Sequence, residues 1–112
     1  MSGDLVIESS QGPSESRISV TGSLVIESSP RLRALLMKAI RQGTSAVLVI
    51  EMSGLGYLDT SGLATLLEAA QVAAAQGVRL HVVGLSGEPK MLAQVVDIDR
   101  IFGAYGSDVE FM

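Results

Sequence analysis

Two neighbouring hydroxyls, Thr60 and Ser61, are the side chains of this chain best placed for chemistry. They stand between Asp59 and Gly62, downstream of an apolar run over 46–50. That order predicts a buried strand, a turn, and a helix that begins directly after Asp59 as its N-cap. Helix starts carry free backbone N–H groups and the positive end of the helix dipole, so they tolerate phosphate well. The segment is therefore interpreted as a phosphorylation switch.

The same sequence argues against catalysis and metal binding. It has no cysteine, which excludes disulfides, thiol catalysis and cysteine metal sites. Its one histidine, His81, falls in the middle of a predicted strand. Gly84-Leu-Ser-Gly87 is not a nucleophile elbow, because Glu88 occupies the place of the final glycine. No EF-hand or phosphate-binding loop occurs. We therefore expect no catalytic residue, no metal, no cofactor and no autonomous use of ATP.

Composition indicates one globular domain over 1–112. Apolar residues make up 47% of the chain and charged residues 18%, and the net charge is −4. An acidic balance argues against nucleic acid as a partner. No signal sequence is visible, and the longest strongly apolar run, over 46–50, is too short to cross a bilayer. The expectation is a cytoplasmic protein that is not inserted in a membrane.

The first part of the chain predicts a hairpin. Leu5–Ile7 is a short apolar strand, and residues 11–16 have turn composition. Residues 17–21 alternate polar and apolar side chains, which indicates a second strand that Gly22 ends. We expect the two strands to pair.

Three helices and two further strands follow. Ser28 or Ser29 should cap a helix that Gly43 ends, and two more helices are predicted over about 60–76 and 87–96. Strands over 46–50 and 78–83 separate them, the first covered on both faces. The expected apolar helix faces are Leu32, Leu35, Leu36 and Ala39; Leu63, Leu66, Leu67, Ala70 and Ala74; and Met91, Leu92, Val95 and Val96.

This order predicts an α/β fold, with a small, mostly parallel mixed sheet of four or five strands, an N-terminal hairpin and flanking helices. Asp97–Asp99 should begin a loop or a last short turn. Ser107-Asp-Val-Glu110 matches a capping box close to the end of the chain. It predicts a C-terminal helix that is truncated or short.

The segment Tyr57-Leu58-Asp59-Thr60-Ser61-Gly62-Leu63 resembles the switch region of the STAS domain, and within that family of the stand-alone bacterial anti-sigma factor antagonists. The resemblance covers nearly the whole chain. Val20–Leu24 is similar to the strand and turn before the family's first helix, and Ser28-Ser29-Pro30 to the start of that helix. Val78–Gly84 resembles the strand after the switch helix.

The resemblance implies the STAS fold and a role in transcription regulation by partner switching. The unphosphorylated domain would bind an anti-sigma factor protein kinase, which would phosphorylate the residue after the aspartate, here Thr60, with Ser61 as second choice. A cognate phosphatase would reverse this. The family more often has serine where this chain has Thr60. Whether the domain forms a homodimer stays open.

The expected partner surface starts at Asp59, Thr60, Ser61 and Gly62 and continues along a neutral stripe of the same helix. That stripe contains Ala64, Glu68 and Gln71. Two alternatives remain at this stage. The domain could be a STAS subunit or scaffold of another assembly, such as a lipid-transport ABC complex or a stress-signalling particle. It could also be a small-ligand or nucleotide sensor that uses the same helix start.

Overall fold

The computed structural model describes residues 4–43 and 45–112, in which strands and helices alternate after an N-terminal hairpin. The elements in chain order are β1 (Val6–Gln11), β2 (Glu15–Leu24), α1 (Ser29–Gln42), β3 (Val47–Leu58), α2 (Thr60–Gln76), β4 (Arg79–Leu85), α3 (Gly87–Val95), α4 (Ile98–Ala104) and β5 (Asp108–Phe111).

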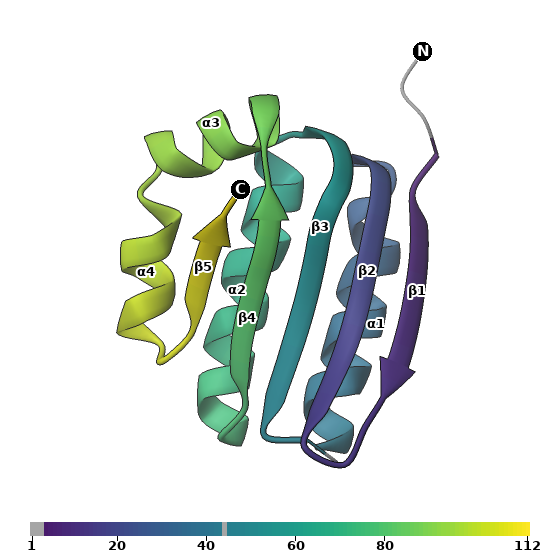
Figure 1. Cartoon of the computed structure of the whole chain (residues 1–112), viewed down its shortest axis with the longest axis vertical. Coiled ribbons are helices and arrows are strands. Elements are labelled where there is room, and N and C mark those ends of the chain that lie inside the picture. Colours follow the sequence, from purple (N-terminus) through teal and green to yellow (C-terminus); the bar gives the residue numbers. More distant parts are fainter. Residues whose placement is uncertain (1–3, 44) are drawn as a thin grey trace.

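The five strands form one mixed sheet in the order β1-β2-β3-β4-β5 (Figure 1). The hairpin pair β1–β2 is antiparallel, and β2, β3, β4 and β5 run parallel to one another. The predicted α/β fold with a mostly parallel sheet and an N-terminal hairpin is therefore confirmed. Because β2 to β5 are parallel, their carboxyl ends all meet at one edge of the sheet.

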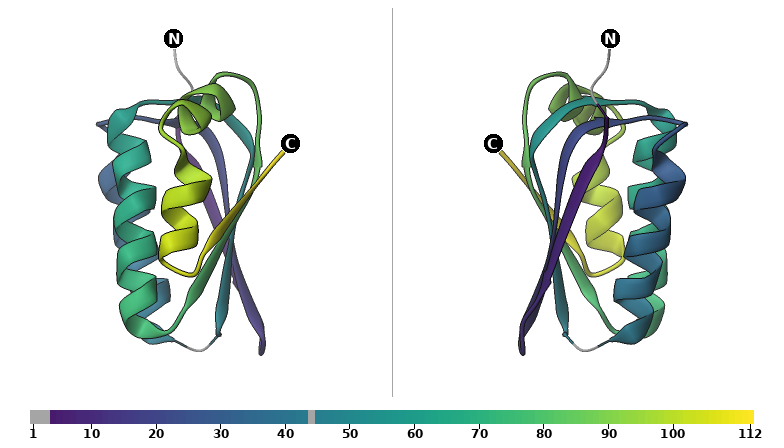
Figure 2. Two further views of the ribbon diagram at one scale, coloured as in Figure 1. Left: turned by 90° about the vertical axis from the view of Figure 1, so that its left-hand side faces the viewer. Right: turned by 90° about the vertical axis from the view of Figure 1, so that its right-hand side faces the viewer.

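The helices cover only one face of this sheet, as the two side views show (Figure 2). Leu48 and Ile50 of β3 belong to the core on the helix side, whereas Val49 does not. Val49 pairs in register with Arg17 on one side and His81 on the other. The prediction that the strand over 46–50 is covered on both faces holds for Leu48, Val49 and Ile50, all of which are buried, but helices provide the cover on one face only (Figure 2). A continuous apolar run is also compatible with a strand that has helices on one face only, because larger polar side chains of the neighbouring strands can shield a valine on the other face.

Strand β2 does not end at Gly22, as the sequence predicted, but continues to Leu24. Gly22 has φ +104° and sits beside a register shift, so it marks a bulge and not a terminus. A Cβ atom at this position would come within 2.0 Å of the Asp4 carbonyl oxygen. The extension pairs Leu24 with Leu58 and so carries β2 to the start of α2.

The predicted buried face of α1 is correct for Leu32 and Leu36 and wrong for Leu35. Leu35 is 38% exposed, whereas Met37 and Ile40 are buried. The helix is therefore rotated slightly from the predicted orientation, and Leu35 faces the flank beside the hairpin. Gly43 ends α1 in the left-handed conformation, as predicted.

Helix α2 has the predicted bounds and ends at Gly77. Leu63, Leu66 and Ala70 are buried as predicted, but Ala74 is exposed and Ala73 is buried in its place. Alanines along the buried side allow the helix to lie close to its neighbours. They are too weakly apolar to fix the helix orientation from the sequence pattern alone.

The C-terminal part departs most from expectation. Asp97, with φ +58°, separates α3 from a further helix, α4, where a loop or short turn was predicted. The capping box predicted at Ser107–Glu110 is absent, because residues 108–111 form β5. Pairing with β4 engages the backbone groups on one side of this segment, and the Ser107 hydroxyl accepts a hydrogen bond from the backbone N–H of Leu80 at 2.9 Å. Tertiary pairing therefore outweighs the local capping signal.

Candidate functional site: the start of helix α2

Helix α2 begins at Thr60 because the carboxylate of Asp59 takes up the backbone donors of its first turn. Asp59 itself has extended backbone angles, with φ −108° and ψ −177°. Its Oδ1 atom accepts hydrogen bonds from the backbone N–H groups of Ser61 at 3.0 Å and Gly62 at 3.1 Å. The predicted N-cap is confirmed, and a cap of this kind typically contributes about 1 kcal/mol.

The same carboxylate also ties α2 to the loop that leads from β2 into α1. Its Oδ2 atom accepts a hydrogen bond from the backbone N–H of Ile26 at 3.1 Å, across 33 positions of sequence. The backbone N–H of Asp59 donates to the Leu24 carbonyl at 3.1 Å. The Oγ atoms of Ser29 and Ser61 lie 3.3 Å apart. The starts of α1 and α2 therefore form one hydrogen-bonded unit.

The two neighbouring hydroxyls of α2 have different surroundings. Ser61 is half-buried, and its Oγ donates to Asp59 Oδ1 at 2.5 Å. Thr60 is exposed, and its hydroxyl has no hydrogen-bond partner among the described residues. A phosphate on Ser61 would remove a donor from Asp59 and place a dianion against its carboxylate. A phosphate on Thr60 would extend into solvent next to the helix N-terminus.

Asp59 is held in its charged form. Partial burial acts to raise the pKa of its carboxyl, but hydrogen bonds from the Ser61 hydroxyl and from the backbone N–H groups of Gly62, Ile26 and Ser61 outweigh burial. The net result is a pKa below the ordinary aspartate value. The carboxylate stays ionised at neutral pH and can act as a cap throughout that range.

Gly62 has a structural reason to be glycine. The sequence analysis placed it in the expected partner surface. In the structure Gly62 is buried, and an added Cβ atom would lie 2.7 Å from Leu24 Cγ, 2.7 Å from Leu58 Cδ1 and 2.8 Å from the Leu24 carbonyl oxygen. The close approach is thus made by this chain's own strand ends.

The predicted partner stripe along α2 is only partly free. Ala64 is exposed. Glu68 accepts hydrogen bonds from Arg33 Nε and Nη2, both at 2.7 Å, and these bonds lower the pKa of its carboxyl. Gln71 donates through Nε2 to the Tyr105 hydroxyl at 3.1 Å. Glu68 and Gln71 therefore join α2 to α1 and α4, although Gln71 is exposed, as Thr60 and Ala64 are.

With this geometry established, comparison with known proteins identifies the family. The family model described as "Mlab, STAS domain" matches residues 7–103. This chain belongs to the STAS-domain family. No curated protein sequence matches it.

Solved structures share the STAS fold at low sequence identity. An anti-sigma factor antagonist from Mycobacterium paratuberculosis aligns with a TM-score of 0.78 and 18% identity, over 87% of this chain and 81% of the other. The anti-sigma factor antagonist SpoIIAA in its unphosphorylated form aligns with a TM-score of 0.73 and 19% identity, over 95% and 87%. The Bacillus cell fate determinant SpoIIAA in its phosphorylated form gives 0.68 and 19%, over 95% and 90%.

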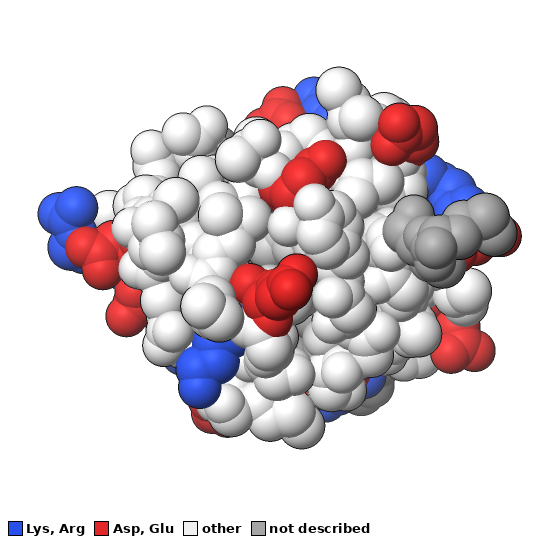
Figure 3. All heavy atoms as spheres, turned by 90° about the horizontal axis from the view of Figure 1, so that it is seen from above, with Lys and Arg blue, Asp and Glu red and all other residues white. Residues whose placement is uncertain are grey.

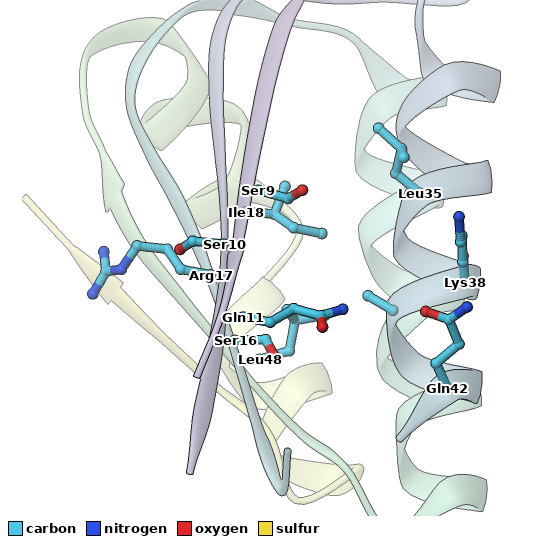
Figure 4. Close-up of a pocket in the computed structure, with 11 residues that line it drawn as sticks. Ser9, Ser10, Gln11, Ser16, Arg17, Ile18, Leu35, Lys38, Gln42 and Leu48 are labelled. Atoms are coloured by element: carbon cyan, nitrogen blue, oxygen red, sulfur yellow. The ribbon is translucent and has the colours of Figure 1, made fainter. Parts of the chain in front are cut away.

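The STAS domain also contains a hollow of about 230 Å³, but it does not lie at the start of α2. Leu35, Lys38 and Gln42 of α1 line one side, and inward-facing side chains of β1 and β2, including Gln11 and Ile18, line the other (Figure 4). The edge strand β1 extends beyond the cover of α1, which leaves this space open. The cavity gives no support to a ligand sensor built on the α2 start.

Other candidates for chemistry in this STAS domain have structural roles. His81 Nδ1 lies 2.8 Å from Asp108 Oδ2, on the sheet face that carries no helices. Ser86 precedes α3 and makes no side-chain cap. Residues 4–43 and 45–112 contain no group of three or more His, Asp or Glu side chains that could hold a metal ion. In the same residues, no helix has the length and apolar character needed to cross a membrane.

Sequence reasoning missed two participants at the α2 start of the STAS domain. The backbone N–H of Ile26 donates to Asp59, and the hydroxyl of Ser29 lies close to that of Ser61. No periodicity or local motif signals these contacts, because a backbone donor has no sequence signature. To predict these contacts, one would have had to know that β2 extends beyond Gly22.

Proposed function

We propose that this STAS domain is an anti-sigma factor antagonist whose binding to an anti-sigma factor protein kinase is controlled by phosphorylation of Thr60. The supporting observation is the exposed Thr60 hydroxyl at a helix start whose capping is already supplied by Asp59. Because Asp59 satisfies the cap, Thr60 is not needed for folding and is free to be modified. The similarity in fold to proteins described as anti-sigma factor antagonists supports the same role.

The proposed switch acts through charge at the docking surface. The kinase transfers the γ-phosphoryl group of ATP to Thr60 Oγ1, and the hydroxyl proton leaves. The phosphate brings a charge of about −1.5 to −2 at neutral pH. The N-terminus of α2 can carry this charge. In the complex, by contrast, the dianion would be desolvated at the contact, which opposes binding. The released anti-sigma factor can then bind its sigma factor again, and transcription changes.

Reversal requires hydrolysis of the phosphate ester by a cognate phosphatase. The adjacent carboxylate, Asp59, is engaged by four hydrogen-bond donors and is therefore not free to assist this step. Both the kinase and the phosphatase are therefore proposed as separate proteins. Asp59, Thr60, Ser61, Gly62, Ala64, Glu68 and Gln71 remain the proposed contact region, with Gly62 in a supporting role beneath the surface.

The proposal is tested by partner affinity with matched variants at one position. Thr60→Ala keeps the surface neutral, so this variant should bind the anti-sigma factor protein kinase with the same affinity as the unphosphorylated wild-type domain. Thr60→Glu, and more strongly a chemically phosphorylated Thr60, should weaken binding by at least about tenfold. Incubation with the kinase and ATP should place one phosphate on Thr60, mapped by mass spectrometry. Equal binding by the phosphorylated form, or a phosphate outside 59–62, would contradict the proposal.

Identification of the bound protein separates this function from its alternatives. A kinase that binds the neutral form and releases the phosphorylated form supports partner switching. A transporter ATPase or a particle subunit would instead favour a STAS subunit of another assembly. The purified domain alone should neither hydrolyse ATP nor phosphorylate itself. Turnover that disappears on mutation of a domain residue would overturn the non-enzymatic assignment.

A further inference from the structure

The exposed large apolar side chains of this domain are concentrated at one edge of the sheet. Seven such residues are found in the described part of the chain, and one of them, Leu35, lies within α1. The other six follow the carboxyl ends of β2 to β5 or begin the antiparallel β1. They are Val6, Ile26, Tyr57, Met91, Val95 and Met112. The topology therefore brings them to the edge where α2 presents Thr60.

Helix α3 contributes the most exposed part of this set. It caps the edge of the sheet next to the start of α2 (Figure 1). Pro89 and Ala93 are buried on its inner side. Met91 and Val95, one helical turn apart, are 65% and 83% exposed on the other side. Two large apolar side chains left in water on a helix of only nine residues need an explanation, because this arrangement gains nothing for the fold.

The charge on this edge indicates which kind of surface would cover it. Seen from above, the face is mostly uncharged; acidic groups stand both near its middle and at its rim, whereas basic groups lie toward the rim (Figure 3). Glu27 in the β2–α1 loop and Glu88 in the first turn of α3 are both exposed. Lys90, the only basic residue of α3, donates to the Met112 carbonyl at 2.8 Å. A complementary surface would be apolar and would place lysine or arginine opposite these acidic groups.

We propose that Met91 and Val95 of α3 form a second docking anchor for the protein that binds at Thr60, and that this partner presents apolar side chains flanked by basic groups. The inference rests on the proposed function, because it assigns the rest of the contact area to the same partner. The α3 anchor supplies affinity through buried apolar area, whereas Thr60 supplies control. The acidic groups speed the encounter with the basic partner surface.

The first experiment asks whether α3 touches a partner in cells. The photo-crosslinking residue benzoylphenylalanine replaces Val95 in one variant and Leu35 of α1 in a matched control. The full chain is expressed in the species that encodes it, and adducts are identified by mass spectrometry. We expect position 95 to give one major adduct with another protein, through a peptide rich in apolar and basic residues. Equal or absent adducts at the two positions, or an adduct only with a second copy of this chain, would overturn the inference.

The second experiment measures affinity for the purified protein identified in that adduct. Met91→Ser combined with Val95→Ser should weaken binding about tenfold or more, with unchanged thermal melting. Leu35→Ser is the control and should bind like wild type. Binding should also weaken as salt is raised, because basic groups of the partner lie opposite Glu27 and Glu88. Unchanged affinity of the double variant would overturn the anchor.

The same measurement distinguishes failure of the anchor from failure of the switch. If the α3 variants lose binding while Thr60→Glu and phosphorylated Thr60 bind like wild type, the anchor holds and phosphorylation control is wrong. If Thr60 variants lose binding while the α3 variants keep it, the switch holds and the anchor is wrong.

Discussion

The starts of α1 and α2 lie side by side and each carries a pair of hydroxyls, yet they use them differently. At α1, Ser28 Oγ donates to the Ser23 carbonyl at 2.9 Å, and Ser29 Oγ donates to the Val25 carbonyl at 2.8 Å. Both hydroxyls hold the incoming loop, and Ser29 is buried. At α2, a carboxylate does the holding, and only Ser61 is engaged. Thr60 is left exposed.

The difference shows what makes a helix start available for modification. Both starts offer a helix dipole, so the dipole does not distinguish them. What distinguishes them is which group satisfies the local backbone. Where the hydroxyls themselves bind the loop, a phosphate would remove bonds that the fold needs. Where Asp59 makes those bonds instead, a neighbouring hydroxyl is not needed to hold the local backbone.

The largest expected effect comes from disturbing the contact of Gly62, at the start of α2, with the ends of β2 and β3. Gly62→Ala should lower the free energy of unfolding by about 1 to 3 kcal/mol, because its Cβ would press on Leu24 and Leu58. Gly103→Ala in α4 is the matched control. Nothing lies within 4 Å of a Cβ there, so helix propensity should stabilise it by up to about 1 kcal/mol. Urea unfolding measures both. Equal stability of the two variants would show that the start of α2 is not packed against these strand ends as described.

Removal of the cap should have the next largest effect. Asp59→Ala leaves the N–H groups of Ser61, Gly62 and Ile26 without their acceptor, and we expect a loss of about 1 to 2 kcal/mol in unfolding free energy. Ser29→Ala at the other start loses the hydrogen bond to the Val25 carbonyl and the longer contact with Ser61 Oγ, and should cost about 1 kcal/mol or less. A larger loss of unfolding free energy for Ser29→Ala than for Asp59→Ala would contradict the view that the carboxylate at α2 holds more of the local structure than the Ser29 hydroxyl at α1.

The sequence predicted the α2 start well and its surroundings poorly. Asp59 as the cap and the bounds of α2 followed from local rules, because capping and helix termination depend on neighbouring residues. The link from Asp59 to Ile26 depends on the β2 extension beyond Gly22, which is set by pairing with β3. Likewise, β5 could not be found locally, since Ser107–Glu110 carries a helix signal that pairing with β4 overrides.

The cap also predicts a pH dependence that only the α2 start should show. The folded-state pKa of Asp59 lies below its unfolded value, so its contribution is fully present above the unfolded pKa of about 4. That contribution is lost as pH falls through the folded pKa. The difference in stability between wild type and Asp59→Asn should therefore be constant from about pH 7 to 5 and shrink below about pH 4, by at most about 1 kcal/mol.

Matched measurements at the other start provide the control for that titration. The first turn of α1 contains no acidic residue, so the difference between wild type and Ser29→Ala should not change over the same pH range. Denaturant unfolding at each pH gives both differences. A difference for Asp59→Asn that grows toward acid would mean that the cap is not made by the ionised carboxylate.

The smallest expected effect is the most informative about Thr60. Thr60→Glu should change the unfolding free energy by less than about 0.5 kcal/mol, because the side chain is exposed and a carboxylate is favourable in the first turn of a helix. Ser61→Glu places the same charge one residue later and should cost at least about 1 kcal/mol, since it removes the donor to Asp59 Oδ1 and adds a like charge beside it. Thermal and urea unfolding of the two variants compare them directly. If both variants are equally destabilised, Thr60 contributes to the stability of the fold. Any loss of partner binding by Thr60→Glu would then reflect that instability and not the docking surface.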